Sequence, residues 1–295
     1  MAKLFGSIEA GGTKFVCAVA NEKFEIIKKI QFATGKPKDT LGQAIDFFKS
    51  FPDLLAIGIG SFGPIDIKKS SKTYGYVTST PKEYWSNVDF LGTLRKELPI
   101  PMSWTTDVNA SAYGEYMFAQ GEKVDSLLYF TIGTGIGGGA LQKGEFIGGF
   151  THAEMGHMMV RQHAEDLDFE GVCPYHKNAC LEGLASGPTI FERTNEHGEN
   201  LPRTHKVFEL IAYYAAQAAY NAYVSLASER IIFGGSVLSE ADMPRVRAYF
   251  EEINAGYVQT PNLEELIQVS KIADNGSATL GNFALAMREY KLTKG

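Results

Sequence analysis

The sequence predicts an α/β protein built from two halves of similar architecture. A strand, a glycine turn and a second strand occur near residue 10 and again near residue 135, at low residue identity. Strands alternate with helical segments along the rest of the chain. The chain has 295 residues, of which 44% are hydrophobic, so one large domain or two of ordinary size can bury a core.

Composition excludes several classes of protein. The net charge of −6 argues against a nucleic-acid-binding surface. Three cysteines are too few for a disulfide framework and indicate a reducing compartment. The segment Leu210–Ser228 carries no charge, but it is rich in Ala and Tyr, which predicts a buried helix of a soluble protein. We expect a cytoplasmic protein without a membrane or nucleic-acid partner.

Apolar runs bounded by turns predict the strands of the first half, at Leu4–Ile8, Phe15–Ala20, Ile26–Phe32, Leu54–Ile59 and Pro101–Thr105. Helical spacing of apolar residues predicts a helix over Thr40–Phe51. Asp107 opens a second helix, Val108–Ala119, which Gly121 closes.

The second half is predicted in the same way. Strands are expected at Ser126–Ile132, Ala140–Gln142 and Arg230–Phe233, with a glycine loop over Gly133–Gly139. The last helix covers Ala278–Tyr290. We expect one domain over residues 1–110, completed by a C-terminal helix at 280–295, and a second domain over residues 111–279 that carries a metal-binding loop.

Glycine turns join the paired strands of both halves. Gly133, Gly135 and Gly138 form a G-x-G-x-x-G pattern, which binds dinucleotides when a helix follows it. A strand follows instead, and G-K-[ST] is absent, so neither a Rossmann motif nor a P-loop is predicted. A plain turn in a sheet remains the alternative for either hairpin alone. Two matching turns favour amides that hold a phosphate chain between the halves, at Gly11, Gly12, Thr13, Lys14, Gly133, Thr134, Gly135 and Gly137.

Asp107 lies where a predicted strand passes into a helix. Aspartate is a common N-cap residue, and that structural role is the alternative for this position. Small residues follow at Ala110, Ser111 and Ala112, and they permit a ligand to approach closely. Asp107 is therefore a candidate general base for an attacking hydroxyl group.

A short segment combines cysteine and histidine. Cys173, His176 and Cys180 follow a C-x2-H-x3-C spacing, and His157 completes a Cys2His2 set. Thiolate and imidazole ligands in a closed set of four indicate a structural Zn²⁺. The alternative is two unpaired cysteines with incidental histidines. Cys17 lies in a predicted strand and is assigned to the core.

Two acidic residues adjoin this cluster. Glu154 precedes His157 by three residues, and Glu182 follows Cys180 by two. Rigidly held carboxylates suit hydrogen bonds to neighbouring sugar hydroxyls, whereas solvated surface charges are the alternative. His152, His163, His197 and His205 receive no role, and Glu192–His205 is predicted to be a solvated loop.

The sequence resembles the ROK family of sugar kinases and repressors over nearly its whole length. The resemblance rests on Glu9–Lys14, Gly60–Pro64, Thr106–Ala110, Gly133–Gly137, Glu154–His157, Cys173–Cys180 and Glu182. It implies the actin-like/hexokinase ATPase fold, a duplicated ribonuclease H-like architecture with a cleft between two domains. Within the family the sequence is most similar to the bacterial fructokinases, through Cys173–His176 and Leu181–Pro188.

The resemblance implies ATP-dependent phosphorylation of D-fructose to fructose 6-phosphate by a homodimer, with ATP, Mg²⁺ and structural Zn²⁺. It implies that Asp107 is the general base and that the two glycine turns bind phosphates. Gly234 and Gly235 match an adenosine motif. The sugar-site positions are Gly63, Pro64, Thr106, Asp107, Glu154, His157 and Glu182.

The sequence departs from the family pattern at several positions. Glu9 stands where the family has Asp, which alters Mg²⁺ binding through water. Thr106 replaces an Asn, and His176 replaces a third Cys of the zinc loop at a shifted position. Family repressors carry an N-terminal helix-turn-helix, whereas this chain begins with the phosphate strand.

Other functions remain alternatives at this point. A ROK kinase for glucose, mannose or an N-acyl sugar would share these motifs, because only pocket geometry selects the sugar. A non-catalytic sugar sensor is a second alternative, against which Asp107 and both glycine turns argue. A nicotinamide oxidoreductase is disfavoured by the strand after Gly139.

Overall fold

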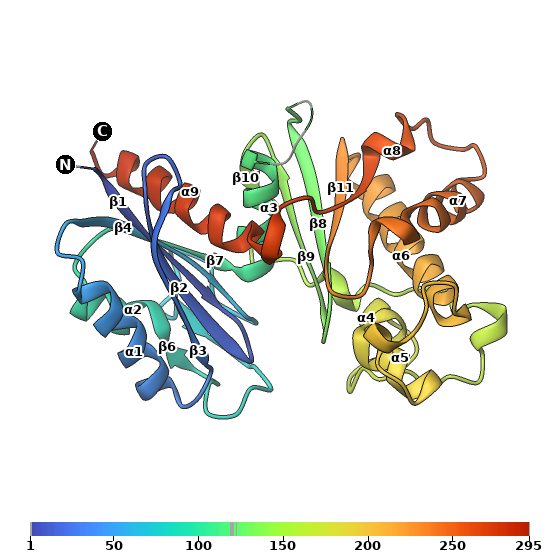
Figure 1. The fold of residues 1–295 in the computed structure, drawn as a ribbon, viewed down its shortest axis with the longest axis horizontal. Coiled ribbons are helices and arrows are strands. Elements are labelled where there is room, and N and C mark those ends of the chain that lie inside the picture. Colours follow the sequence, from blue (N-terminus) through green and yellow to red (C-terminus); the bar gives the residue numbers. More distant parts are fainter. Residues whose placement is uncertain (1, 119–120, 122, 295) are drawn as a thin grey trace. The chain divides into compact units, whose positions relative to one another are not determined.

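The computed structural model describes residues 2–118, 121 and 123–294. Contacts along the chain divide it into two compact units. Unit 1 comprises residues 1–120, 146–152 and 272–295, and unit 2 comprises residues 121–145 and 153–271. Unit 1 is thus assembled from three separate stretches of the chain, and its last stretch is the red C-terminal helix of Figure 1.

Unit 1 is built on a sheet with the strand order β3-β2-β1-β4-β7. Its strands are β1 (Leu4–Ala10), β2 (Lys14–Asn21), β3 (Ile26–Ala33), β4 (Leu54–Ser61) and β7 (Met102–Thr106). β1, β2 and β3 pair antiparallel, whereas β1, β4 and β7 run parallel. A small hairpin of β5 (Tyr76–Val77) and β6 (Val88–Asp89) lies outside this sheet.

Helices cover both faces of the unit 1 sheet (Figure 1). α1 (Pro37–Lys49) and α2 (Phe90–Glu97) pack on one face around Phe15, Phe48 and Trp85. α3 (Asp107–Phe118) and α9 (Ser277–Leu292) cover the other face, where the sheet presents small residues. Gly58 is one of these, because a Cβ there would collide with the carbonyl oxygen of Asn282 in α9. Glycine in β4 therefore lets α9 lie close to the strand.

Unit 2 repeats the plan of unit 1. Its sheet has the order β10-β9-β8-β11-β12. β8 pairs antiparallel with β9 and parallel with β11, as β1 does with β2 and β4. The duplication predicted from the sequence is confirmed. The strands are β8 (Ser126–Ile132), β9 (Ile136–Gln142), β10 (Glu145–Phe146), β11 (Arg230–Gly235) and β12 (Ile267–Val269).

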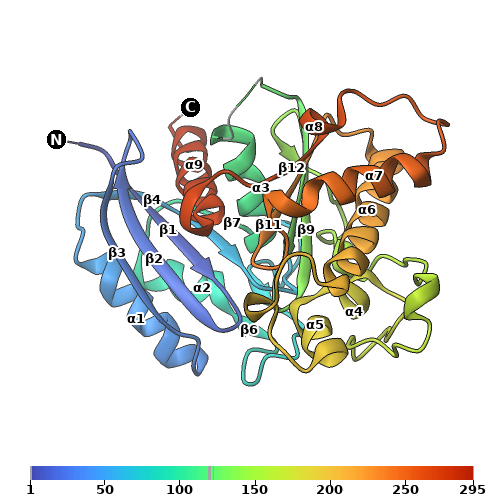
Figure 2. The same ribbon diagram turned by 45° about the vertical axis from the view of Figure 1, so that its right-hand side comes forward.

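The long uncharged segment of unit 2 forms α6 (Lys206–Leu226), which is buried on most sides. α7 (Met243–Asn254) lies beside it, as Figure 2 shows. Among the described residues, none of the helices combines the length and the hydrophobicity of a membrane-spanning segment. The remaining helices are α4 (Leu181–Ala185), α5 (Gly187–Thr194) and α8 (Leu263–Leu266), with 3-10 turns at Met155–His157, Ala164–Asp166, Gly198–Asn200, Glu240–Asp242 and, in unit 1, Ala273–Asn275.

Two expectations about boundaries differ from the structure. The glycine loop expected over Gly133–Gly139 is a short turn, because Ile136 already pairs with Ile132 and the following glycines belong to β9. The unit boundaries fall after residues 120 and 271, rather than after 110 and 279, because the whole of α3 packs against α9 inside unit 1. The predicted end of α3 at Ala119 lies outside the described residues.

Candidate functional site

The first glycine turn of unit 1 is a tight connection between β1 and β2. The Gly11 amide donates to the Lys14 carbonyl oxygen at 2.9 Å, and the Thr34 hydroxyl donates to the Gly11 carbonyl oxygen at 2.7 Å. Gly12, Thr13 and Lys14 are exposed. The turn is therefore held from behind by these hydrogen bonds, while Gly12, Thr13 and Lys14 at its tip are accessible to solvent.

Glu9 precedes this turn on the face of β1 that α9 covers. The Thr279 hydroxyl donates to Glu9 Oε2 at 3.2 Å. Burial raises the pKa of the Glu9 carboxyl above its ordinary value, and the Thr279 hydrogen bond and the charges of Lys14 and Lys29 oppose this only partly. Glu9 is thus a half-buried acid near the carboxyl end of a strand.

Asp107 is the first residue of α3, directly after β7. The cap of this helix belongs to Thr106, whose hydroxyl oxygen accepts from the Asn109 amide at 3.1 Å. Asp107 Oδ1 accepts from the next amide, Val108 N, at 2.9 Å, and the residue is half-buried. Thr106 therefore fills the N-cap role that was the structural alternative for Asp107, and Asp107 remains a candidate for the general base.

The predicted sugar-lining turn at Gly63 and Pro64 is joined by a cis peptide bond. Pro64 O accepts from the Thr78 amide at 2.8 Å. Beside it, His152 Nε2 accepts from the Ile65 amide at 3.1 Å, and His152 is only 4% exposed. Sequence reasoning gave His152 no role because its partner lies 87 residues away. The structure makes it a support of this turn.

The second glycine turn, in unit 2, connects β8 and β9. The Gly133 amide donates to the Gly135 carbonyl oxygen at 2.9 Å, and Thr134 is exposed at the tip. The neighbouring amide of Ile136 donates to Glu182 Oε2 at 2.9 Å. Glu182, predicted as a sugar-site acid, thus has one carboxylate oxygen directed at the turn.

The predicted metal ligands come together in unit 2. The ligand atoms of His157, Cys173, His176 and Cys180 all lie within 4.8 Å of one another. Cys173 Sγ is 3.8 Å from Nδ1 of both histidines, and Cys180 Sγ is 3.9 Å from His157 Nδ1. Ideal Zn–S and Zn–N bonds in a tetrahedron separate S and N by about 3.5 Å. The set is therefore compatible with Zn²⁺.

The chemistry of the thiols agrees with this interpretation. All three cysteines of the chain are free rather than disulfide-bonded. Burial raises the pKa of the Cys180 thiol to about 11. A cation bound there would displace that proton and compensate the buried thiolate. Cys17 is fully buried in β2, as the sequence predicted.

Glu154, the other predicted sugar-site acid, differs from Glu182 in its surroundings. It is exposed, and its carbonyl oxygen accepts from the His157 amide at 3.0 Å at the start of a 3-10 turn. The backbone of Glu154 is therefore fixed beside a metal-ligand candidate, whereas its carboxylate reaches solvent.

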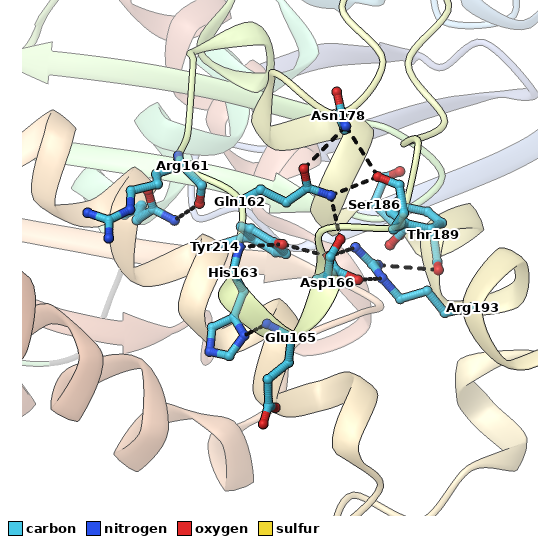
Figure 3. A network of polar contacts seen from close by, with 12 residues as sticks. Arg161, Gln162, His163, Glu165, Asp166, Asn178, Ser186, Thr189, Arg193 and Tyr214 are labelled. Carbon is cyan, nitrogen blue, oxygen red and sulfur yellow. Dashed lines mark hydrogen bonds and ion pairs between the residues drawn. The ribbon is translucent and has the colours of Figure 1, made fainter.

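A buried ion pair ties the segment between His157 and Cys173 to two helices (Figure 3). Arg193 of α5 donates to Asp166 through Nε at 2.9 Å and through Nη2 at 2.7 Å. The Tyr214 hydroxyl, from α6, donates to Asp166 Oδ2 at 2.6 Å. The Arg193 guanidinium also lies 3.8 Å from the ring centre of Phe169. No local pattern in the sequence pointed to this network.

A cavity of about 820 Å³ opens next to the second glycine turn in unit 2. The segment Glu192–His205, predicted to be a solvated loop, is exposed or half-exposed throughout, although Glu192–Thr194 belong to α5 and seven of the fourteen residues line this cavity. The predicted adenosine motif, Gly234 and Gly235, directly precedes two lining residues: Gly235 turns with φ = +88° and leads into Ser236 and Val237. The lining residues are Gly133, Thr134, Gly187, Pro188, Ile190, Phe191, Glu192, His197, Gly198, Glu199, Leu201, Pro202, Arg203, Phe208, Ser236 and Val237.

Comparisons with known proteins place this geometry in context. A model of the ROK family matches residues 5–289. The fructokinase of Streptococcus mutans serotype c is 51% identical over 292 residues, which cover 98% of this chain and 99% of the relative. The fructokinase of Lactococcus lactis subsp. cremoris is 50% identical over 288 residues, which cover 97% of this chain and 98% of the relative.

Solved structures show the same fold. The structure of a ROK family glucokinase from Streptomyces griseus in complex with glucose and AMPPNP matches with a TM-score of 0.74 at 22% identity. The match covers 98% of this chain and all of that one. The hexokinase-type ATPase fold class that the sequence predicted is thereby confirmed.

Proposed function

The chain belongs to the ROK family, and from this membership we propose that it phosphorylates D-fructose at the 6-hydroxyl group with ATP. The single observation that carries the fructose assignment is the sequence identity of 51% and 50% to two fructokinases over nearly the full length of both chains. Two relatives named glucokinase, from Halalkalibacterium halodurans and Streptomyces coelicolor, match at 26% and 24% identity. The sugar preference therefore follows the relatives with the higher identity.

The nucleotide is assigned to unit 2 in this proposal. The exposed Thr134 and the amides of its turn bind phosphate oxygens, because glycine amides can approach an anion closely. The adjoining cavity of about 820 Å³ suits a nucleoside in volume, and it begins at the same two residues, Gly133 and Thr134. Adenosine would lie between the wall that contains Ser236 and the wall that contains Phe191.

Asp107 is the proposed general base. Its carboxylate accepts the proton of the sugar hydroxyl as that oxygen attacks the γ-phosphorus and the bond to the ADP oxygen breaks. Thr106 supports this role, because its cap of α3 fixes the backbone that carries Asp107. The half-buried position keeps the carboxylate accessible to a hydroxyl.

Mg²⁺ is the expected companion of ATP, and unit 1 offers oxygen donors of the kind it prefers. Glu9 pairs in register with Gly60, and Gly60 with Thr105, so Glu9 and Asp107 lie at the carboxyl ends of strands in one sheet. The family's Asp is replaced by a longer Glu, whose carboxylate Thr279 holds by a hydrogen bond. The ion would neutralise charge on the phosphates.

Zn²⁺ is proposed as a structural ion at His157, Cys173, His176 and Cys180. Four protein ligands leave no open position for a substrate, so the ion would fix the loop that carries Glu154 and Glu182. Both carboxylates are proposed to hydrogen-bond sugar hydroxyls. A homodimer is part of the proposal from family membership, and analytical ultracentrifugation tests it.

The experiment is an ADP-release assay with Mg²⁺–ATP and fructose, mannose or glucose. We expect turnover with fructose, and we expect Asp107→Asn to lower kcat by about 100-fold or more, because a positioned base contributes that much. Asp39→Asn is the matched control, since Asp39 also occupies the first turn of a helix in unit 1 but is exposed.

Two outcomes would overturn parts of this proposal. Turnover with glucose alone would retain the kinase and discard the fructose assignment. Full activity in Asp107→Asn would remove Asp107 from its role as the base.

A further inference from the structure

We infer that Glu182 is a positioning residue that fixes the second glycine turn for the phosphates of the nucleotide, in addition to any contact with the sugar. This inference rests on the proposed nucleotide site. Its basis is one hydrogen bond: the Ile136 amide donates to Glu182 Oε2 at 2.9 Å. Ile136 is the first residue of β9, so this contact fixes the point where the turn becomes a strand.

Gly135 makes the contact sterically possible. A Cβ at Gly135 would lie 2.8 Å from Glu182 Oε2, which is too close for an undisturbed contact. The absence of a side chain therefore lets the carboxylate reach the amide behind it. The turn glycine thus has a second purpose besides leaving room for a ligand.

A second hydrogen bond from the same segment reaches the other side of the turn. The Gly187 amide, at the start of α5, donates to the Gly133 carbonyl oxygen at 2.7 Å. Glu182 and Gly187 thus contact both ends of the stretch Gly133–Ile136. Glu182 lies in α4, which begins directly after Cys180. The same short helix therefore connects the metal-ligand candidate Cys180 to the glycine turn.

Electrostatics alone predicts the opposite result of removing Glu182. A carboxylate close to phosphates repels them, so its loss should strengthen nucleotide binding if charge is all that matters. If the carboxylate positions the turn, its loss should weaken binding, because nothing then fixes the Ile136 amide at the point where the turn passes into β9. The sign of the change in ADP affinity therefore separates the two interpretations.

The experiment is isothermal titration of ADP with Mg²⁺ into the full-length protein without sugar. We expect Glu182→Ala to weaken ADP binding by about tenfold, the effect of losing one hydrogen bond to a charged acceptor. Glu182→Gln should restore near-wild-type ADP affinity, because its amide oxygen still accepts from Ile136. Glu170→Ala, which removes an exposed carboxylate from the same region of unit 2, is the matched control and should not change ADP affinity.

Gly135→Ala provides a route that keeps Glu182 itself. The Cβ of Gly135→Ala displaces the Glu182 carboxylate, so ADP binding should weaken as it does in Glu182→Ala. The inference can therefore be tested even if Glu182→Ala folds poorly. Unchanged or tighter ADP binding by Glu182→Ala, with normal binding by the wild type, would overturn this inference alone. Absence of ADP binding by the wild type would overturn the proposed function and this inference with it.

Discussion

Replacing Arg193 by methionine should destabilise unit 2 by about 3–5 kcal/mol, the usual cost of leaving one member of a buried ion pair alone. The Arg193 and Asp166 side chains are only 8% and 5% exposed, and two hydrogen bonds join them. Methionine keeps much of the aliphatic volume but donates no hydrogen bond. Asp166 would then be left with the Tyr214 hydroxyl in place of a cation.

A surface ion pair with a single contact of similar length provides the control. Lys49 Nζ lies 2.6 Å from Glu97 Oε2, but these side chains are 48% and 43% exposed. Lys49→Met should therefore cost less than about 1 kcal/mol. Removing both buried charges in Arg193→Met/Asp166→Leu should recover most of the loss, because no isolated charge remains.

Urea unfolding followed by two probes measures these changes. Both tryptophans of the chain, Trp85 and Trp104, lie in unit 1, so their fluorescence follows that unit, whereas far-ultraviolet circular dichroism follows both units. Arg193→Met should lower the midpoint of the dichroism transition. A loss no larger than that of Lys49→Met would refute the argument from burial.

Three further changes have expected outcomes. Burial raises the pKa of Glu9 in the folded protein above its ordinary 4.5, so the wild-type protein loses stability as the pH rises through that folded-state pKa. Glu9→Gln should therefore be more stable than the wild type above the folded-state pKa and should lose this advantage below about pH 4.5. Unfolding monitored by tryptophan fluorescence at several pH values checks this. An unchanged pH profile would show that Glu9 ionises freely. Cys180→Ser should lower the melting temperature and the zinc content and raise KM for the sugar; no zinc in the wild type, with equal melting temperatures, would contradict this. Gly58→Ala should destabilise unit 1 by roughly 2 kcal/mol or more, because the new methyl group displaces α9, and an unshifted fluorescence transition would contradict the close packing.

Sequence reasoning succeeded where local patterns determine structure. The apolar run Ser126–Ile132 has the bounds of β8, and the strand-turn-strand repeat anticipated the shared order of the two sheets. The spacing of the cysteines and histidines predicted a cluster of four ligand residues, and their ligand atoms lie close together in the structure. These features depend on side-chain periodicity and on short ligand spacings, which are visible in one sequence.

Features that depend on distant partners were missed. Arg193 lies in a charge-rich stretch that reads as solvated, yet Asp166, 27 residues away, makes it part of the interior. His152 is buried and accepts a hydrogen bond from the Ile65 amide, a contact between distant residues that no local pattern in the sequence indicates. The glycines after Ile136 resemble a loop by composition, but pairing with β8 makes them a strand. In each case tertiary contacts override a local preference.

The division of unit 1 into three stretches of chain has a consequence for biosynthesis. α9, which covers one face of the first sheet, begins at residue 277, after all of unit 2 has been made. Until α9 emerges from the ribosome, the face formed by Phe5, Ala18 and Ala56 lacks Phe283 and Ala286. The strands and helices of unit 2 are therefore all synthesised before α9. Until then the N-terminal sheet of the nascent chain has an uncovered apolar surface, the kind of surface that chaperones bind.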